Sequence, residues 1–250
     1  SPLTVMRGYL EELASDAIDP SPELYGRLVR ETRRLERLVR DTQELSKVEA
    51  GHFPKVIQMI AEESLRRVIV GVVDQLRDQV LEAELTLAVD LPEVLPPIAA
   101  DGDRLHQILV NLLSNALRHT STGTITVWAR RFSPQFSHPE KLPSPDNTQN
   151  NRAQNNPDKN SLWLGVTDTG EGIAAESLSY IFERFWQGDV SRDRQGEQPP
   201  SQRRTSGAGI GLAITKQLVE RHGGKIVAVS EQHRGSTFYF DLPLAKTGWK

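Results

Sequence analysis

The sequence predicts an α+β protein: a helical hairpin that forms a dimeric four-helix bundle, followed by a two-layer α/β sandwich. Three observations predict this fold class. Apolar residues recur every three or four positions through the first 50 residues, which is helical spacing. From about Lys55 onward, strand-like segments and amphipathic helices follow one another, as in a sheet covered by helices. The composition, 37% hydrophobic and 25% charged, suits packed cores and excludes a fully disordered chain.

The N-terminal region divides into two helices. One apolar stripe on the first helix is formed by Leu3, Met6, Leu10, Leu13 and Ala17. The prolines in Asp19–Pro22 end this helix, and a second helix is expected from about Glu23 to Ala50, before Gly51. Two helices cannot bury a core alone, so the hairpin predicts pairing with a second copy. Packing against the rest of its own chain is the alternative.

The remaining elements alternate between strands and helices. Strands are expected over Lys55–Met59, Leu85–Leu91, Pro97–Ala100, Thr124–Phe132, Leu162–Asp168, Lys225–Ser230 and Ser236–Leu242, the last two as a closing hairpin. Helices are expected over Leu65–Val80, Asp103–His119 and Ile210–His222. This arrangement places a sheet on one side and helices on the other.

Two stretches do not fit regular elements. Residues 133–160 combine five prolines with repeated Asn and Gln, which predicts a disordered insert between two strands, with partner docking as the alternative. Residues 186–208 are polar and lie between two motifs. A long loop in that position is expected to be functional.

Composition excludes several classes of function. The net charge of −3 gives no basic field for nucleic acid, and the absence of cysteine excludes disulfides and thiolate metal sites. Apolar runs fall far short of the roughly 18–20 residues that a membrane span needs. Because the sequence begins with Ser1 rather than Met, we expect a fragment whose parent protein could carry membrane segments.

The first cluster that carries chemistry runs from Asn111 to His119. Asn111 and Asn115 are four positions apart, so both amides leave the same face of the expected helix. An amide oxygen can bind Mg²⁺, and an amide NH₂ can donate to a phosphate. The alternative is a helix with two satisfied polar residues.

The second cluster, Asp168-Thr169-Gly170-Glu171-Gly172, directly follows an expected strand. Glycines let the backbone approach a ligand closely. A carboxylate only accepts hydrogen bonds, so it can take the amino group of adenine, whereas guanine presents an oxygen there. The alternative is an ordinary Asp/Gly turn.

Two further clusters flank the polar loop. Gly207-Ala208-Gly209-Ile210-Gly211-Leu212 opens a helix, where exposed N–H groups and the helix dipole favour phosphate. No Gly-Lys-Ser/Thr follows, so it is not a Walker loop, and a lone glycine repeat is a weak signal. Phe182-Glu183-Arg184-Phe185 is an aromatic pair whose alternative role is core packing.

The order and combination of these clusters resemble the sensor histidine kinases of two-component systems, where they correspond to the N, G1, F and G2 boxes of an ATP-binding catalytic domain. Residues 101–109, DGDRLHQIL, resemble the lead-in to the N box. Residues 35–51, LERLVRDTQELSKVEAG, resemble the second helix of the dimerisation and histidine-phosphotransfer domain. The resemblance implies a phosphotransfer hairpin over 1–51, truncated at its N-terminus, and a catalytic domain over 52–244. The latter is of the ATPase type shared with type II topoisomerases and the 90-kDa chaperones.

The resemblance also implies a role for each matching residue. Asn111 would bind Mg²⁺, and Asn115 would contact the metal or the phosphates. Asp168 would accept a hydrogen bond from the adenine amino group, with Gly170 and Gly172 shaping the loop around it.

Further matches concern the phosphates and the walls of the pocket. Arg118 occupies a basic position that faces phosphate, and His119 stands where an aromatic side chain usually packs near adenine. The phosphates would be cradled by Gly207, Gly209, Gly211 and Leu212. Phe185 would also line the nucleotide site. Residues 186–208 would form the ATP lid, from which Arg192, or less directly Arg203 and Arg204, could reach the γ-phosphate; a solvated basic loop is the alternative.

The resemblance implies an ATP-dependent protein-histidine kinase that uses ATP and Mg²⁺. We expect a cytoplasmic homodimer that passes the phosphoryl group to an aspartate of a response regulator, without nucleic acid or membrane contact by this fragment. Ser1-Pro2-Leu3-Thr4 resembles the end of the motif that carries the acceptor histidine, which would therefore lie upstream of Ser1. None of the six histidines present replaces it, so the fragment is expected to bind ATP without phosphorylating itself.

Two other functions are compatible with the same clusters. ATPases that share this fold carry a Glu four residues before the second Asn to activate water, but that position is Asn111 here, which cannot act as a base. A nucleotide-binding scaffold that signals by dimerisation alone is the other alternative.

Overall fold

The computed structural model describes residues 2–49, 57–131, 161–186 and 209–245. The chain divides into two compact units, one within 1–53 and 183–214 and the other within 54–182 and 215–250. The predicted insert at 133–160, most of the predicted lid at 186–208 and the hairpin's junction to the second region lie outside the described residues. None of the helices in the described ranges is both long and apolar enough to cross a membrane.

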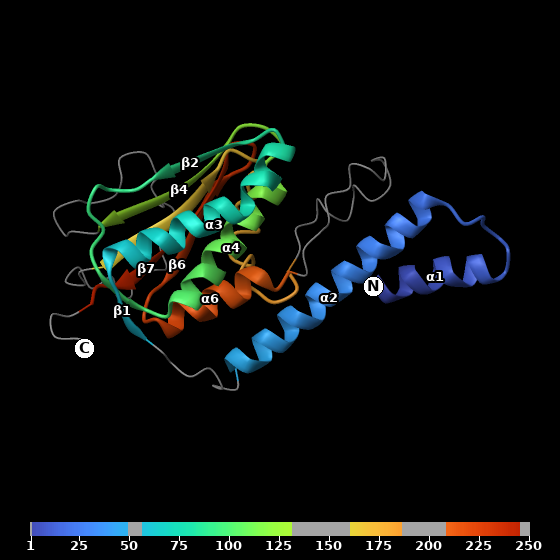
Figure 1. Ribbon diagram of the computed structural model, residues 1–250, viewed down its shortest axis with the longest axis horizontal. Coiled ribbons are helices and arrows are strands. Elements are labelled where there is room, and N and C mark those ends of the chain that lie inside the picture. Colours follow the sequence, from blue (N-terminus) through green and yellow to red (C-terminus); the bar gives the residue numbers. More distant parts are fainter. Residues whose placement is uncertain (1, 50–56, 132–160, 187–208, 246–250) are drawn as a thin grey trace. The chain divides into compact units, whose positions relative to one another are not determined.

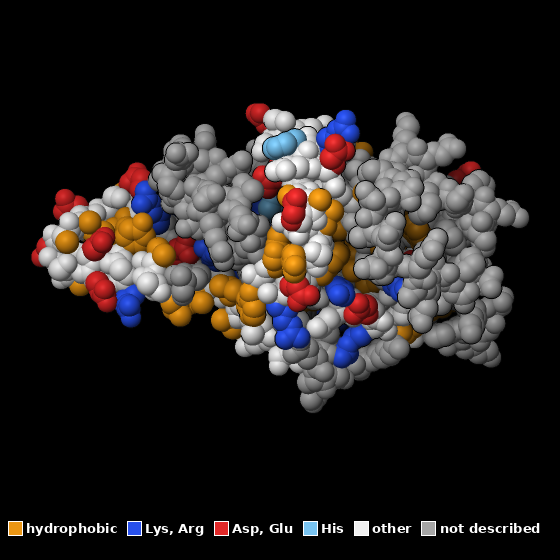
Figure 2. Space-filling model, turned by 180° about the vertical axis from the view of Figure 1, so that it is seen from behind, with side chains coloured by type: hydrophobic (Ala, Val, Ile, Leu, Met, Phe, Trp, Pro, Cys, Tyr) orange, Lys and Arg blue, Asp and Glu red, His pale blue; other side chains and the backbone are white. Residues whose placement is uncertain are grey.

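The N-terminal hairpin consists of α1 (Pro2–Ala14) and α2 (Pro22–Glu49). Ser21 begins α2 by accepting a hydrogen bond from Leu24 N through its Oγ, at 3.1 Å, as an N-cap does. The Arg27 guanidinium donates to the Tyr9 hydroxyl at 3.2 Å and so joins the two helices. Figure 2 shows hydrophobic side chains among charged ones on the surface of the hairpin, at the left of that view.

The second unit is built on a mixed five-stranded sheet (Figure 1) with the order β2-β4-β5-β7-β6. Its strands are β2 (Thr86–Asp90), β4 (Thr124–Arg131), β5 (Ser161–Asp168), β6 (Ile226–Glu231) and β7 (Gly235–Pro243). β2 and β4 are parallel, and all other neighbours are antiparallel. A separate antiparallel pair is formed by β1 (Gln58–Ile60) and β3 (Ile98–Ala100).

Three helices lie on one face of this sheet in Figure 1: α3 (Glu62–Glu82), α4 (Gly102–His119) and α6 (Gly211–Arg221). The apolar side of α4 is fully buried, with Leu105, Ile108, Leu109, Leu112 and Leu113 each at most 1% exposed. On β5 the residues of even number, such as Leu164 and Val166, are buried as well, because alternate side chains of a strand point to one face. The core therefore lies between the helices and the sheet, which confirms the predicted two-layer sandwich after a helical hairpin.

The predicted elements agree closely with the observed ones. Every expected strand and helix has a counterpart in the described ranges, and the ends that lie within those ranges differ by a few residues at most. The closing hairpin is confirmed, since β6 and β7 pair antiparallel from Ile226↔Phe240 to Glu231↔Gly235. The limits of the two domains, 1–51 and 52–244, remain a prediction.

Candidate functional site

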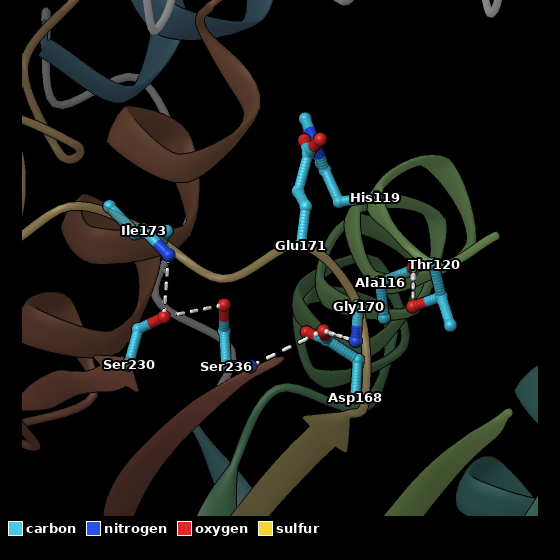
Figure 3. A network of polar contacts seen from close by, with 9 residues as sticks. All are labelled: Ala116, His119, Thr120, Asp168, Gly170, Glu171, Ile173, Ser230 and Ser236. Atoms are coloured by element: carbon cyan, nitrogen blue, oxygen red, sulfur yellow. Dashed lines mark hydrogen bonds and ion pairs between the residues drawn. The ribbon is translucent and has the colours of Figure 1, made fainter. Parts of the chain in front are cut away.

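Asp168 is the last residue of β5, and its side chain is held by two backbone donors. Gly170 N donates to its Oδ1 at 2.9 Å, and Ser236 N, at the start of β7, donates to the same oxygen at 3.3 Å (Figure 3). The residue is only 4% exposed. The carboxylate is therefore fixed by the loop that follows it and by the neighbouring strand.

The electrostatics of Asp168 are set by opposing influences. Burial raises the pKa of this carboxyl above its ordinary value of 3.8, and the hydrogen bonds from Gly170 and Ser236 partly oppose the rise. Both hydrogen bonds end on Oδ1. Within the described ranges Oδ2 accepts no hydrogen bond, so it is an acceptor suited to a donor group on a ligand.

The two glycines after Asp168 are required by close backbone approaches. A Cβ on Gly170 would clash with the carbonyl oxygen of His119, at the end of α4. Gly172 has φ +67°, and a Cβ there would clash with the carbonyl oxygen of Glu231. The loop thus lies tightly between the end of α4 and the β6–β7 turn.

His119 and Glu171 fasten this loop to α4 a second time. Glu171 N donates to His119 O at 3.0 Å, and the His119 Nδ1 lies 2.6 Å from Glu171 Oε1 (Figure 3). Both side chains are partly exposed, so this side-chain contact contributes little to stability by itself. Together with the backbone bond, it fixes the position of the residues around Asp168.

Two serines that the sequence analysis did not single out complete this part of the site. Ser230 Oγ accepts from Ile173 N at 2.8 Å and donates to Gly235 O at 2.8 Å. The hydroxyl oxygens of Ser230 and Ser236 are 2.9 Å apart, and the backbone N–H of Ser236 donates to Asp168 Oδ1. No local signal could have identified them, because they lie about 60 residues further along the chain.

The asparagines lie on α4 as predicted. Asn111 and Asn115 are both half-buried, and the Asn111 Nδ2 donates to the hydroxyl of Thr215 on α6 at 3.3 Å. Arg118 is half-buried one turn further on. α4 thus carries two amides and a basic residue along one stretch that ends at His119, beside the Asp168 loop.

The described residues of the glycine cluster and Phe185 lie in the other compact unit, whereas Phe182 belongs to the same unit as Asp168. Gly209 has φ +71°, accepts a hydrogen bond from Phe185 N at 2.8 Å, and would place a Cβ 2.6 Å from Trp186 O. Gly211 and Leu212 begin α6 and are half-buried. Gly207, Arg192, Arg203 and Arg204 lie outside the described residues.

Phe185 is 59% exposed, with φ +60°. Core packing, the alternative considered for the aromatic pair, is therefore wrong for Phe185, whereas Phe182 is half-buried.

The amide oxygens of Asn111 and Asn115 on α4 are the groups of the proposed site that could bind a cation. Within the described ranges no cluster of three His, Asp or Glu side chains could hold a metal by itself. Mg²⁺ commonly takes one or two protein oxygens and completes its shell with water and substrate phosphates. The single Asn111 amide fits such a shared site and does not fit an all-protein one.

Two family models match the sequence. One, described as "Histidine kinase-, DNA gyrase B-, and HSP90-like ATPase", matches residues 100–246. The other, described as "His Kinase A (phospho-acceptor) domain", matches residues 1–51.

Several curated proteins are similar along nearly the whole chain. The sensor histidine kinase WalK of Bacillus subtilis is 30% identical over 246 residues, which cover 97% of this chain and 34% of WalK. The probable sensor histidine kinase TcrY of Mycobacterium tuberculosis is 32% identical over 252 residues, which cover 100% of this chain and 44% of TcrY. This chain thus spans less than half the length of either relative.

Solved structures share the fold at low sequence identity. The histidine kinase AdeS of Acinetobacter baumannii superposes with a TM-score of 0.68 at 20% identity, covering 98% of this chain and 96% of AdeS. Full-length ShkA in complex with AMPPNP superposes with a TM-score of 0.63 at 22% identity, covering 98% of this chain and 46% of ShkA. Histidine kinase ThkA, in complex with the response regulator protein TrrA, superposes with a TM-score of 0.67 at 18% identity. The match covers 98% of this chain and 58% of the ThkA chain.

Proposed function

Because this chain belongs to the sensor histidine kinases, we propose that it is a cytoplasmic kinase core that binds Mg²⁺-ATP. In the intact protein it would support transfer of the γ-phosphoryl group to a histidine and then to an aspartate of a response regulator. Residues 1–51 would serve as the dimerisation and phosphotransfer hairpin, and residues 52–244 as the ATP-binding domain. The complexes of ShkA with AMPPNP and of ThkA with TrrA support the nucleotide and the partner.

The observation that carries this proposal is the environment of Asp168. Its Oδ1 is occupied by two backbone donors, and its Oδ2 can accept a hydrogen bond from the amino group of adenine. A guanine would present a carbonyl oxygen at the same place, and two acceptors would face each other. An unpaired buried polar group costs about 1–3 kcal/mol, so Asp168 selects adenine over guanine.

The phosphate tail would be bound by the other clusters. Asn111 would hold Mg²⁺ through its amide oxygen, and Asn115 and Arg118 would contact metal or phosphates. The backbone N–H groups of Gly207, Gly209, Gly211 and Leu212 would cradle the phosphates at the start of α6. His119 and Phe185 would line the nucleotide site, and Arg192 would reach the γ-phosphate from the lid.

Catalysis in such a site consists of positioning and charge neutralisation. A bound Mg²⁺ would neutralise charge that develops on the phosphates. The residues of this chain would hold the γ-phosphoryl group in line with a neutral imidazole, which can attack directly. We assign the acceptor role to none of the six histidines in this sequence.

One alternative is an ATPase of the same fold. A water-activating base would be needed in place of Asn111, and an amide cannot take a proton from water. The other alternative is a scaffold that does not bind nucleotide tightly.

Calorimetry with Mg²⁺-ATP and Mg²⁺-GTP tests the proposal and the alternatives together. We expect ATP to bind roughly 5- to 150-fold more tightly than GTP, because the mismatch at Asp168 costs about 1–3 kcal/mol. Incubation with ATP should leave no acid-labile phosphate on these 250 residues. Equal binding of the two nucleotides, or no binding of either, would contradict the proposed site.

A further inference from the structure

His222 is a buried titratable residue that the proposed nucleotide site does not use. It follows α6 directly and is 7% exposed. Its ring contacts two backbone groups: Nδ1 lies 2.7 Å from Leu218 O, and Asp101 N donates to Nε2 at 3.0 Å. Leu218 belongs to the last turns of α6, whereas Asp101 is the N-cap residue of α4.

These two contacts determine the protonation of the ring. The Asp101 N–H can only donate, so Nε2 must be the unprotonated nitrogen. The Leu218 carbonyl can only accept, so Nδ1 must carry the proton. His222 is therefore neutral, in the Nδ1–H tautomer, whenever both hydrogen bonds are formed.

The contact with Asp101 satisfies a backbone N–H at the start of α4, and the first N–H groups of a helix have no intrahelical partners. Leu218 O accepts from His222 N at 3.2 Å as well, so the ring is a second donor to this carbonyl near the end of α6. One imidazole thus caps the start of α4 and joins it to the end of α6.

A second polar contact joins the same pair of helices. The Asn111 amide of α4 donates to the hydroxyl of Thr215, a residue of α6 that is 0% exposed. The two contacts lie about two turns apart on α6, so they fix both the spacing and the tilt of the helices.

We propose that His222 is a positioning residue that, as a neutral imidazole, holds α6 in register with α4. The proposal rests on the proposed function in one respect: α4 carries Asn111 and Asn115, and α6 begins at the glycines assigned to the phosphates. Loss of the His222 contacts would therefore weaken binding of the phosphate tail more than binding of adenine, which Asp168 reads from β5.

Protonation of His222 would break the link. A proton on Nε2 removes the acceptor for Asp101 N–H and places a positive charge at the N-terminus of α4, where the helix dipole disfavours it. The C-terminal end of the α6 dipole favours a positive charge, but the Leu218 carbonyl at that end already accepts from Nδ1 of the neutral ring. The Asp101 carboxylate already accepts from Asp103 N and Arg104 N as the cap of α4.

The first test is spectroscopic and needs no nucleotide. Long-range ¹H–¹⁵N spectra of the chain labelled in histidine should show one of its six rings as the Nδ1–H tautomer at neutral pH, and His222→Gln should remove that signal. A ring of His222 that carries its proton on Nε2, or that is charged at pH 7, would overturn the proposal.

The second test is the stability of the folded chain at a single pH, about 7.5, measured by denaturant titration. His222→Leu removes both hydrogen bonds and should raise the ratio of unfolded to folded protein roughly 5- to 150-fold, and His222→Gln should raise it less. His106→Gln, a half-buried histidine of α4 outside the proposed site, is the matched control and should follow the wild type. A His222→Leu variant as stable as the wild type would refute the bridge.

The third test connects His222 with the nucleotide. His222→Leu removes both hydrogen bonds and should weaken Mg²⁺-ADP binding about tenfold, with adenosine binding within about twofold of wild type. His222→Gln, which offers both an acceptor and a donor, should recover part of the Mg²⁺-ADP affinity. Equal losses for the two ligands would contradict the positioning role. A wild type that binds neither ligand would instead refute the proposed function, and the first two tests would still decide the state of His222.

Discussion

At the scale of single residues, the proposed selection of the nucleotide depends on the buried carboxylate of Asp168. Asp168→Asn keeps an oxygen for Gly170 N and Ser236 N but replaces Oδ2 with a donor, which in the proposed site would face the adenine amino group. We expect ATP affinity to fall by about 1–3 kcal/mol, or roughly 5- to 150-fold, in calorimetry. Asp74→Asn, on the exposed side of α3, is the control and should bind as the wild type does.

The same substitution has a predicted effect on stability. Burial raises the pKa of Asp168 above 3.8, so the folded chain holds this proton more tightly than the unfolded chain. The stabilisation from that proton is fully present below pH 3.8 and is lost as pH rises through the raised pKa. Asp168→Asn should therefore unfold at neutral pH no more easily than wild type, and its melting temperature should depend less on pH. A large loss of stability would show that the carboxylate is needed for folding and not only for the ligand.

Gly170 permits a second prediction at this scale. A Cβ there would clash with His119 O and would disturb the N–H that binds Asp168. Gly170→Ala should cost about 1–3 kcal/mol of stability through the clash with His119 O and should weaken ATP binding as well. Denaturant titration and calorimetry measure the two effects. Wild-type values for both would show that the loop can move away from α4 at no cost.

At the scale of elements, replacing a glycine inside a helix should raise stability, whereas replacing Gly170 should lower it. Gly71 lies on the exposed side of α3, and a Cβ there would have no atom within 4 Å. Gly71→Ala should raise the free energy of unfolding by about 0.5–1 kcal/mol, because alanine has the higher helix propensity. Denaturant titration should show this gain with unchanged ATP binding. Paired with Gly170→Ala, it separates a glycine needed for a close approach from one that is not.

Elements are also the level at which the sequence predicts the structure well. The helix from Asp103 to His119 was expected from its apolar spacing, and the observed α4 begins one residue earlier, at Gly102. The position of Asp168 at the end of a strand followed from the β-branched run before it. These features depend on side chains close together in the chain, which periodicity and turn residues encode directly.

Features that depend on distant parts of the chain were not predictable in this way. The parallel pairing of β2 with β4 and the separate β1–β3 sheet depend on which strands meet, and a local pattern does not specify its partner. Ser236 N reaches Asp168 only because β7 lies beside β5. The bridge made by His222 likewise depends on the arrangement of α6 beside α4. The sequence therefore predicts the residue types of the proposed site and does not predict the backbone groups that orient Asp168.

At the scale of the whole molecule, the hairpin exposes more apolar surface than a monomer would need to. Leu3, Leu10 and Val29 are 58%, 52% and 48% exposed, and Tyr25 and Val39 are about as exposed. Burying such residues between two copies would form the four-helix bundle that the apolar stripe predicts, and each large side chain contributes about 1.5–3 kcal/mol when fully buried. We therefore predict that the chain sediments as a dimer at micromolar concentration.

Leu10→Lys combined with Val29→Lys should convert this dimer to a monomer, because burial would place two charges per chain in an apolar interface. ATP affinity should stay within about twofold of the wild type, since Asp168, the proposed adenine contact, lies in the other compact unit. The matched control is Leu81→Lys with Val94→Lys, which changes two side chains of that unit that are 66% and 69% exposed and should leave the dimer intact. Sedimentation velocity distinguishes the outcomes. A wild-type monomer would contradict the predicted dimer, and a dimer that survives the hairpin substitutions would place the dimer contact away from Leu10 and Val29.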